Sequence, residues 1–147
     1  MEYSVGKVGR VFLLKFSQDD EFIREIEGLC KKENVSCAVF YIIGGINSAD
    51  IVSGPSNEDM PPIPILSSID KKSEIVGIGT VFLVDRAPKI HLHAAVSKGD
   101  DIRVGCIRGN ARTFLVSEVV MLELNDIDAK RVFDKESGFN LLKIFDK

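Results

Sequence analysis

The stretch KIHLHAAV at residues 89–96, followed by the turn KGDD at residues 98–101, is the most informative part of this chain. Side chains alternate across a β-strand, so a strand over 89–97 has one apolar face and one more polar face. His91 and His93, the only histidines in the sequence, both fall on the polar face. Their Cα atoms lie about 6.5–7 Å apart, a separation that lets two imidazoles converge on one metal ion.

The turn sets the register of the next predicted strand, which covers residues 103–108. Gly99 at the first central position suits a two-residue type II′ loop. With that loop, His93 lies opposite Cys106 and His91 lies opposite Arg108, and directly paired residues project from the same face. A four-residue loop gives the same pairs, whereas a three-residue loop would turn Cys106 to the other face.

Two histidines and one cysteine with a vacant fourth position form a known catalytic zinc arrangement. The sequence therefore predicts a metal site at His91, His93 and Cys106, with zinc favoured and other divalent transition metals left open. Zinc would hold Cys106 as a thiolate, and a bound water could become a nucleophile near neutral pH. Arg108 is a candidate for binding a carboxylate or phosphate on a ligand. The alternative is two hydrogen-bonded histidines, a buried apolar Cys106, and a surface or trimer-contact charge at Arg108.

Around this hairpin the pattern predicts one α+β domain over residues 1–147, with a mostly antiparallel or mixed sheet and one main helix. The helix is capped at Ser17 and ends at a left-handed Asn34. Residues 54–73 hold four of the five prolines and are expected to form a long loop, either functional or a plain surface excursion. The predicted strands cover residues 10–16, 36–43, 46–52, 74–84, 89–97, 103–108 and 113–124, with a closing hairpin of 130–134 and 140–145.

Composition restricts the class of protein. The 147 residues are 45% hydrophobic and 28% charged, which is typical of a globular domain, and no apolar run approaches the ~20 residues of a membrane span. Three cysteines and no visible secretory signal favour the cytoplasm, with Cys30 and Cys37 in the core.

The charge pattern bears on partners. A net charge of −3 argues against general nucleic-acid binding. Residues 86–112 nevertheless hold six basic and two acidic residues, which suits a specific anionic partner or simply a solvated face.

Several segments resemble the PPC (plants and prokaryotes conserved) domain family. The stretch at 89–96 resembles its K-x-H-L-H-x-S-x signature. Four further segments also resemble it in order: GGINS at 44–48, EIVGIGT at 74–80, SEVV at 117–120 and GFNLL at 138–142. Cys106 stands where the family pattern has a third histidine.

The resemblance implies a sheet-rich homotrimer that is similar at the level of fold to acetolactate decarboxylase, a zinc enzyme. We expect a small metal-binding protein that acts on or senses a small anionic ligand, and we leave open whether it is an enzyme. Glu74 and Glu118 are candidate acid or base partners. The alternatives are a DNA-binding regulator and a scaffold that only oligomerises. The DNA reading is weakened because the Arg-Gly-Arg-Pro AT-hook of plant members is absent.

Overall fold

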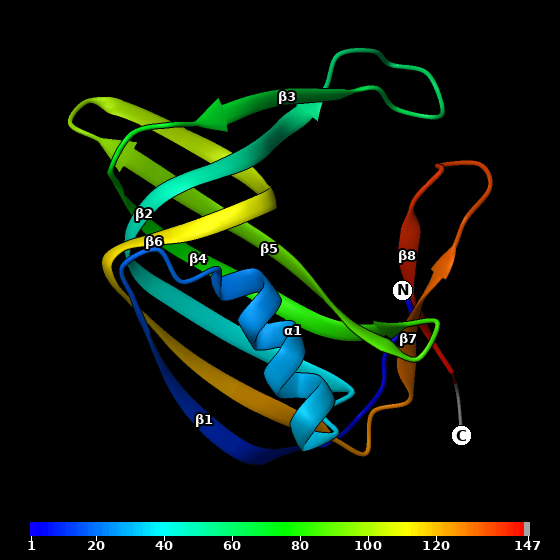
Figure 1. The fold of residues 1–147 in the computed structure, drawn as a ribbon. Helices are drawn as coiled ribbons and strands as arrows, with labels where there is room; N and C mark the ends of the chain where they lie inside the picture. Colours follow the sequence, from blue (N-terminus) through cyan, green and yellow to red (C-terminus); the bar gives the residue numbers. More distant parts are fainter. Residues whose placement is uncertain (146–147) are drawn as a thin grey trace.

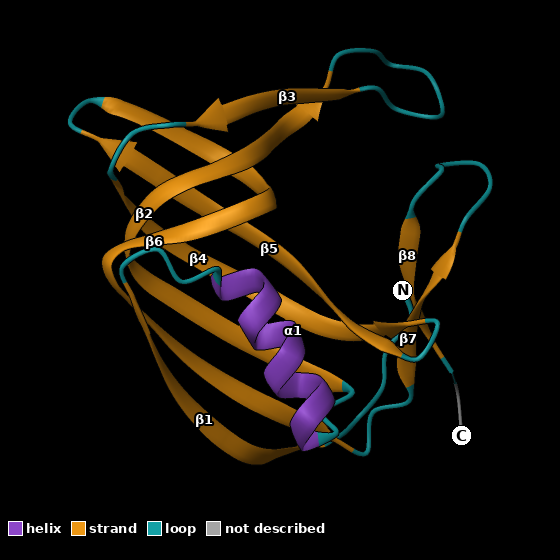
Figure 2. Cartoon of the chain, viewed as in Figure 1, coloured by secondary structure: helices purple, strands orange, loops and turns teal. Residues whose placement is uncertain are grey.

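Eight β-strands and one α-helix make up residues 1–145, the part of the chain that the computed structural model describes (Figure 1). Strands dominate, and the helix lies across one face of the curved sheet (Figure 2). In chain order the elements are β1 (Lys7–Ser17), α1 (Phe22–Glu33), β2 (Cys37–Pro55), β3 (Pro64–Ile69), β4 (Ser73–Val84), β5 (Ala87–Lys98), β6 (Asp101–Asn125), β7 (Ala129–Phe133) and β8 (Asn140–Ile144).

The sheet closes on itself. Strand β2 pairs with β4, β4 with β5, β5 with β6, and β6 with β2, all antiparallel, so these four pairings return to the strand where they began. Strand β1 extends the sheet beyond β6, and β7 joins β4 through a single parallel bridge. The predicted α+β class with one helix and a mostly antiparallel sheet is thus confirmed for the described residues.

Helix α1 covers the inner face of this sheet with an apolar stripe of Phe22, Ile26 and Cys30, all fully buried. Asn34 ends the helix in the left-handed conformation, at φ 57°, as predicted. The predicted cap at Ser17 is wrong, because Ser17 is the last residue of β1 and the helix begins at Phe22. The Asp20 carboxylate accepts a hydrogen bond from the Ser17 backbone N–H, so these polar groups close the turn before the helix.

Two pairs of predicted strands are each one long bent strand. Residues 36–43 and 46–52 form β2, and 103–108 and 113–124 form β6. The bend lies at Gly44, where φ is +128° and a Cβ would come within 2.4 Å of the Val116 carbonyl oxygen. Glycine therefore permits a close backbone approach at which the strands shift register without separating.

The predicted loop at residues 54–73 is also partly wrong. Strand β3 lies within it and pairs with the distal half of β2, from Ala49 to Pro55, to form an extended arm (Figure 1). The connection at the tip is held by Asn57, whose side-chain oxygen accepts a 2.6 Å hydrogen bond from the Ile63 backbone N–H. The prolines favoured a loop in the prediction, but β3 is a short strand at the edge of the sheet, where proline is tolerated.

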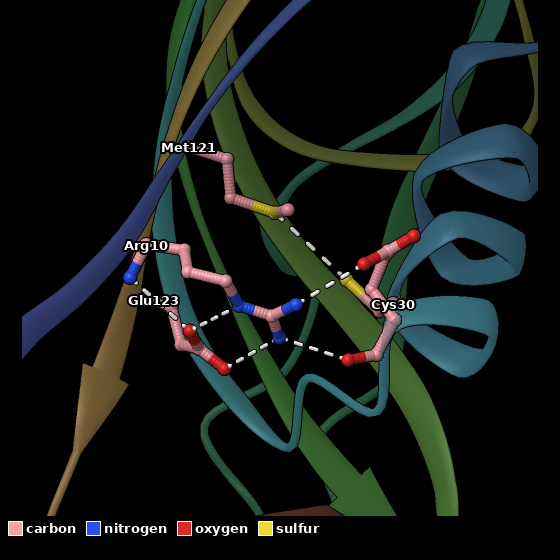
Figure 3. A network of polar contacts seen from close by, with 5 residues as sticks. Arg10, Cys30, Met121 and Glu123 are labelled. Carbon is pink, nitrogen blue, oxygen red and sulfur yellow. Dashed lines mark hydrogen bonds and ion pairs between the residues drawn. The ribbon is translucent and has the colours of Figure 1, made fainter.

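An ion cluster joins β1, β6 and the end of helix α1 (Figure 3). Arg10 of β1 contacts the Glu123 carboxylate of β6 at 2.8 Å and the Glu33 carboxylate of α1 at 3.1 Å. Its guanidinium also donates to the Glu33 backbone carbonyl at 2.8 Å. One side chain therefore holds β1, β6 and the end of α1 together.

The two cysteines expected in the core are buried in two neighbouring apolar clusters, Cys30 in the larger and Cys37 in the smaller. Cys30 lies 3.8 Å from the Met121 sulfur, as Figure 3 shows, and Cys37 lies 3.7 Å from the Ala129 carbonyl oxygen. Both are buried and free, so the prediction for them is confirmed. Within residues 1–145 no helix combines the length and apolar character needed to cross a membrane.

Candidate metal centre and adjoining pocket

Strand β5 alternates as the sequence predicts. Leu92, Ala94 and Val96 are buried in the core, whereas His91 and His93 are exposed on the outer face. Cross-strand partners continue that face over β4, where His91 is paired with Thr80 and His93 with Ile78. The sheet thus presents both imidazoles side by side, pointing away from the core.

The predicted register is confirmed, and it brings the third residue in. His93 is paired with Cys106 through the turn at 99–100. The Nε2 atoms of His91 and His93 are 3.1 Å apart, and the ring planes meet at 77°. The candidate ligand atoms of His91, His93 and Cys106 all lie within 4.8 Å of one another.

These distances fit a zinc ion. Tetrahedral bonds of about 2.0–2.1 Å to nitrogen place two ligand nitrogens about 3.3 Å apart, close to the separation of the two Nε2 atoms. A Zn–S bond of about 2.3 Å places sulfur about 3.6 Å from each nitrogen, so the Cys106 sulfur would shift by roughly 1 Å at most. Two imidazoles and one thiolate are also a donor set that zinc prefers.

Local electrostatics act differently on His91 and on Cys106. Burial against the surrounding wall, followed by the charges of Arg131, His93 and Arg108, lowers the pKa of His91 to about 4. Although part of its ring is exposed, His91 is therefore neutral near pH 7, as a metal ligand must be. Burial raises the pKa of the Cys106 thiol, and the charges of Arg108 and Arg131 act against that rise.

Arg108 reaches the site by a route that differs from the predicted one. The β5–β6 ladder ends at His93 and Cys106, so it does not reach Arg108, which is paired with Asp50 of β2 on the other side of β6. The predicted pairing of Arg108 with His91 is therefore wrong, although the register of the hairpin is as predicted. Arg108 nevertheless lines the same pocket as His91 and lowers its pKa, so the two side chains are neighbours.

Arg131 is a site residue that the sequence did not reveal. It lies on β7, and its Nη2 donates a 2.9 Å hydrogen bond to Thr80, the cross-strand partner of His91. Its guanidinium lies 5.6 Å from the centre of the Phe82 ring. The backbone bridge that joins β7 to the sheet, between Leu83 and Lys130, is a long-range pairing with no local sequence signal.

A pocket of about 560 Å³ opens beside His91. Its polar lining includes the basic residues Lys89, His91, Arg108 and Arg131. Much of the remaining lining comes from the β7–β8 hairpin. The apolar residues of the wall are Val84, Ile90, Phe133, Phe139, Leu141 and Leu142.

Glu74 and Glu118 lie away from this site. Glu74 is paired with Ser97, four residues along β5 from His93, which corresponds to about 13 Å. Glu118 lies on β6 and is paired with Ile43 of β2. Across this part of the sheet, strands β2 and β4 lie between Glu118 and His93 of β5. Neither glutamate lines the pocket, so the structure does not support them as acid or base partners.

An exposed apolar row leads across the outer face to the site. Leu13 of β1, Val120 of β6, Tyr41 of β2 and Ile78 of β4 are successive cross-strand partners, and Ile78 is paired with His93. All four are exposed, Leu13 by 78%. Contiguous apolar surface of this kind marks an interaction face.

The fold and site together describe a sheet-rich, one-helix domain with a histidine–cysteine cluster beside a basic pocket. The chain matches the model of the Plants and Prokaryotes Conserved (PCC) domain over residues 3–125. It belongs to that family, which confirms the resemblance found in the sequence. A comparison with curated protein sequences finds no match.

Solved structures share the fold. A metal-containing protein from Archaeoglobus fulgidus is 24% identical, with 96% of this chain and 98% of that chain covered and a TM-score of 0.84. A PPC protein from Pyrococcus horikoshii is 21% identical over the whole of both chains, also with a TM-score of 0.84. A protein from Bacteroides thetaiotaomicron, described as a candidate DNA-binding protein, is 18% identical over 97% of each chain, with a TM-score of 0.78.

Proposed function

We propose that this protein is a small homotrimeric metal-binding protein of the cytoplasm that acts on or senses a small anionic ligand. The observation that carries the proposal is the convergence of the candidate ligand atoms of His91, His93 and Cys106 within 4.8 Å. Zinc is the favoured metal because this donor set and these spacings suit it. A bound zinc ion would supply Lewis acidity and an activated water, and Arg108 would hold the anionic group of the ligand.

The direct test is metal analysis of protein purified without chelators. We expect about one metal ion per chain, with a sharp fall in His91→Ala, His93→Ala and Cys106→Ala. Cys37→Ala is the matched control, because Cys37 is a buried free cysteine outside the site. Metal-free wild-type protein, or equal losses in Cys37→Ala and Cys106→Ala, would contradict the proposal.

X-ray absorption spectroscopy of the loaded protein then separates two roles. Three protein ligands and one water would favour catalysis, whereas four protein ligands would favour a structural ion. We favour the first outcome, because the family resemblance implies a fold similar to that of acetolactate decarboxylase, a zinc enzyme.

The trimer is supported by the exposed apolar row formed by Leu13, Val120, Tyr41 and Ile78. Light scattering should give a mass of three chains, and Tyr41→Glu should release monomers because it places a charge in the middle of the row. We also propose that the single domain extends over 1–147, past the end of the family match. Within the described residues, β7 packs on β2 through Ala129 and Cys37; residues 146–147 lie outside them.

DNA binding is the second candidate, and the description of the Bacteroides neighbour favours it. The basic segment 86–112 runs along β5 and the first half of β6. Two of its cations are already paired, Lys89 with Glu27 and Arg103 with Asp101. Duplex DNA affinity that falls steeply with salt and is weakened by Arg112→Gln would support this function.

A further inference from the structure

The pocket beside His91 is lined by two arginines, Arg108 and Arg131, and Asp50, the cross-strand partner of Arg108, does not line it. Within residues 1–145, five ion pairs occur, and neither Arg108 nor Arg131 takes part in any of them. No acidic residue lines the pocket. The remaining lysine, Lys89, is already paired with Glu27 at 2.8 Å. Two guanidinium groups therefore face the pocket without counter-ions.

Arg131 is the more telling of the two. Its guanidinium is partly buried, and its Nε atom is buried with no hydrogen-bond partner in residues 1–145. Thr80 accepts from Nη2, and the Phe82 ring lies nearby, so the side chain is held in place while part of its donor capacity stays unused. The Nη hydrogens that Thr80 does not use are donors from which an anionic ligand in the pocket can accept.

The apolar lining of the pocket shows what else the ligand must carry. Phe133, Phe139 and Leu141 of the β7–β8 hairpin are each at least 40% exposed in the free protein. Together with Val84 and Ile90 they line the pocket. An inorganic anion would leave this wall bare, whereas an apolar substituent would cover it. A volume of about 560 Å³ is within the range of sites for small organic molecules.

We propose that this pocket binds a small organic carboxylate with an apolar body. Arg108 and Arg131 hold the carboxylate, because a guanidinium donates two parallel hydrogen bonds to its two oxygens. The apolar body lies against the β7–β8 hairpin, with Phe139 as a contact. The inference deepens the proposed function, since it names the class of anion that is bound beside His91.

Metal-free protein provides a test that does not depend on the metal proposal. Binding of benzoate, acetate, benzyl alcohol and inorganic phosphate is measured by NMR chemical-shift titration after treatment with a chelator. We expect benzoate to bind at least about tenfold more tightly than each of the other three, because it alone combines a carboxylate with an apolar ring. Phosphate binding as tight as benzoate would overturn the proposal in favour of a phosphate site. Equal affinity for acetate or for benzyl alcohol would also overturn it.

Variants assign the binding to named side chains. Arg108→Gln and Arg131→Gln should each weaken benzoate about tenfold or more, whereas Arg24→Gln, on the exposed face of α1, should leave it unchanged. Phe139→Ala should weaken benzoate and leave acetate unaffected. Because Arg131→Gln could disturb folding through Thr80, Arg131→Lys serves as a second variant that keeps the charge and loses the fork. Full benzoate affinity in Arg108→Gln or in Arg131→Lys would refute the proposed role of that arginine.

The outcomes separate the two proposals. Benzoate binding that needs both arginines in a protein that never takes up metal would keep the carboxylate site and reject the metal centre. Stoichiometric metal, together with benzoate binding that neither arginine variant weakens, would keep the metal centre and reject the carboxylate site.

Discussion

Replacing Gly79 with alanine tests how the core supports the candidate site. Gly79 lies on β4, paired with Phe40 of β2 and with Leu92, the residue between the two histidines. A Cβ at Gly79 would lie 2.1 Å from Cζ of Phe40 and 2.4 Å from its Cε1. Ordinary carbon contacts are about 3.5–4.0 Å, so the fully buried ring must retreat by roughly 1.4 Å.

The expected cost follows from two opposing terms. Overpacking of a dense core costs about 1–3 kcal/mol, and alanine recovers about 0.4–1 kcal/mol by restricting the unfolded chain. We expect Gly79→Ala to lower the free energy of unfolding by about 1–2 kcal/mol, which for a chain of this length lowers Tm by about 2–8 °C. The space that a side chain at Gly79 would need is filled by the Phe40 ring.

The assay is thermal and urea unfolding at one fixed protein concentration, because an oligomer's stability depends on concentration. Gly28→Ala is the matched control: nothing lies within 4 Å of its added Cβ on the exposed side of α1, so it should stabilise by about 0.5–1 kcal/mol. Adding Phe40→Leu to Gly79→Ala should cost less than the two single changes summed. A Gly79→Ala protein as stable as the wild type, or additive single changes, would refute the reasoning.

Two further predictions concern the ion cluster and the pocket. The hydrogen bond from Arg10 lowers the pKa of Glu123 below its ordinary value of 4.5, so this carboxylate stabilises the fold above that value and loses its effect as pH falls through the lowered pKa. Urea unfolding from pH 7 to pH 3 should show the deficit of Glu123→Gln shrinking toward acid, and a deficit that stays constant with pH would contradict this. Thr80→Val should weaken benzoate binding about three- to tenfold by freeing the Arg131 guanidinium, and Thr80→Ser should restore it. Equal affinities in Thr80→Val and Thr80→Ser would show that the hydroxyl does not position Arg131.

The local part of the site could be predicted from the sequence. Alternation places His91 and His93 on one face, and the turn at Gly99 fixes the residue opposite His93. Both rules act within a single strand or a single hairpin, so one sequence is enough to apply them. The same holds for the end of the helix at Asn34.

What the sequence could not show depends on contacts between distant segments. Arg131 enters the site through Thr80, and only the fold brings these two residues together. The sequence places Arg108 opposite His91 by extending the β5–β6 ladder, but that ladder ends at Cys106, and beyond it β6 keeps only its pairing with β2. Glycines at a bend were interpreted as strand ends, whereas Gly44 lets a long strand continue through the bend.

The ion pair of Arg10 with Glu123 has a consequence for how the chain folds. These residues are 113 positions apart, and they join the first strand of the sheet to the far end of β6. During synthesis β1 emerges early and its partner strand emerges late, so the core-facing side chains of β1, Leu14 and Phe16, stay uncovered in the meantime. Pairing across such a sequence separation slows folding, so we expect slow refolding and a nascent chain that is prone to aggregate until β6 is complete.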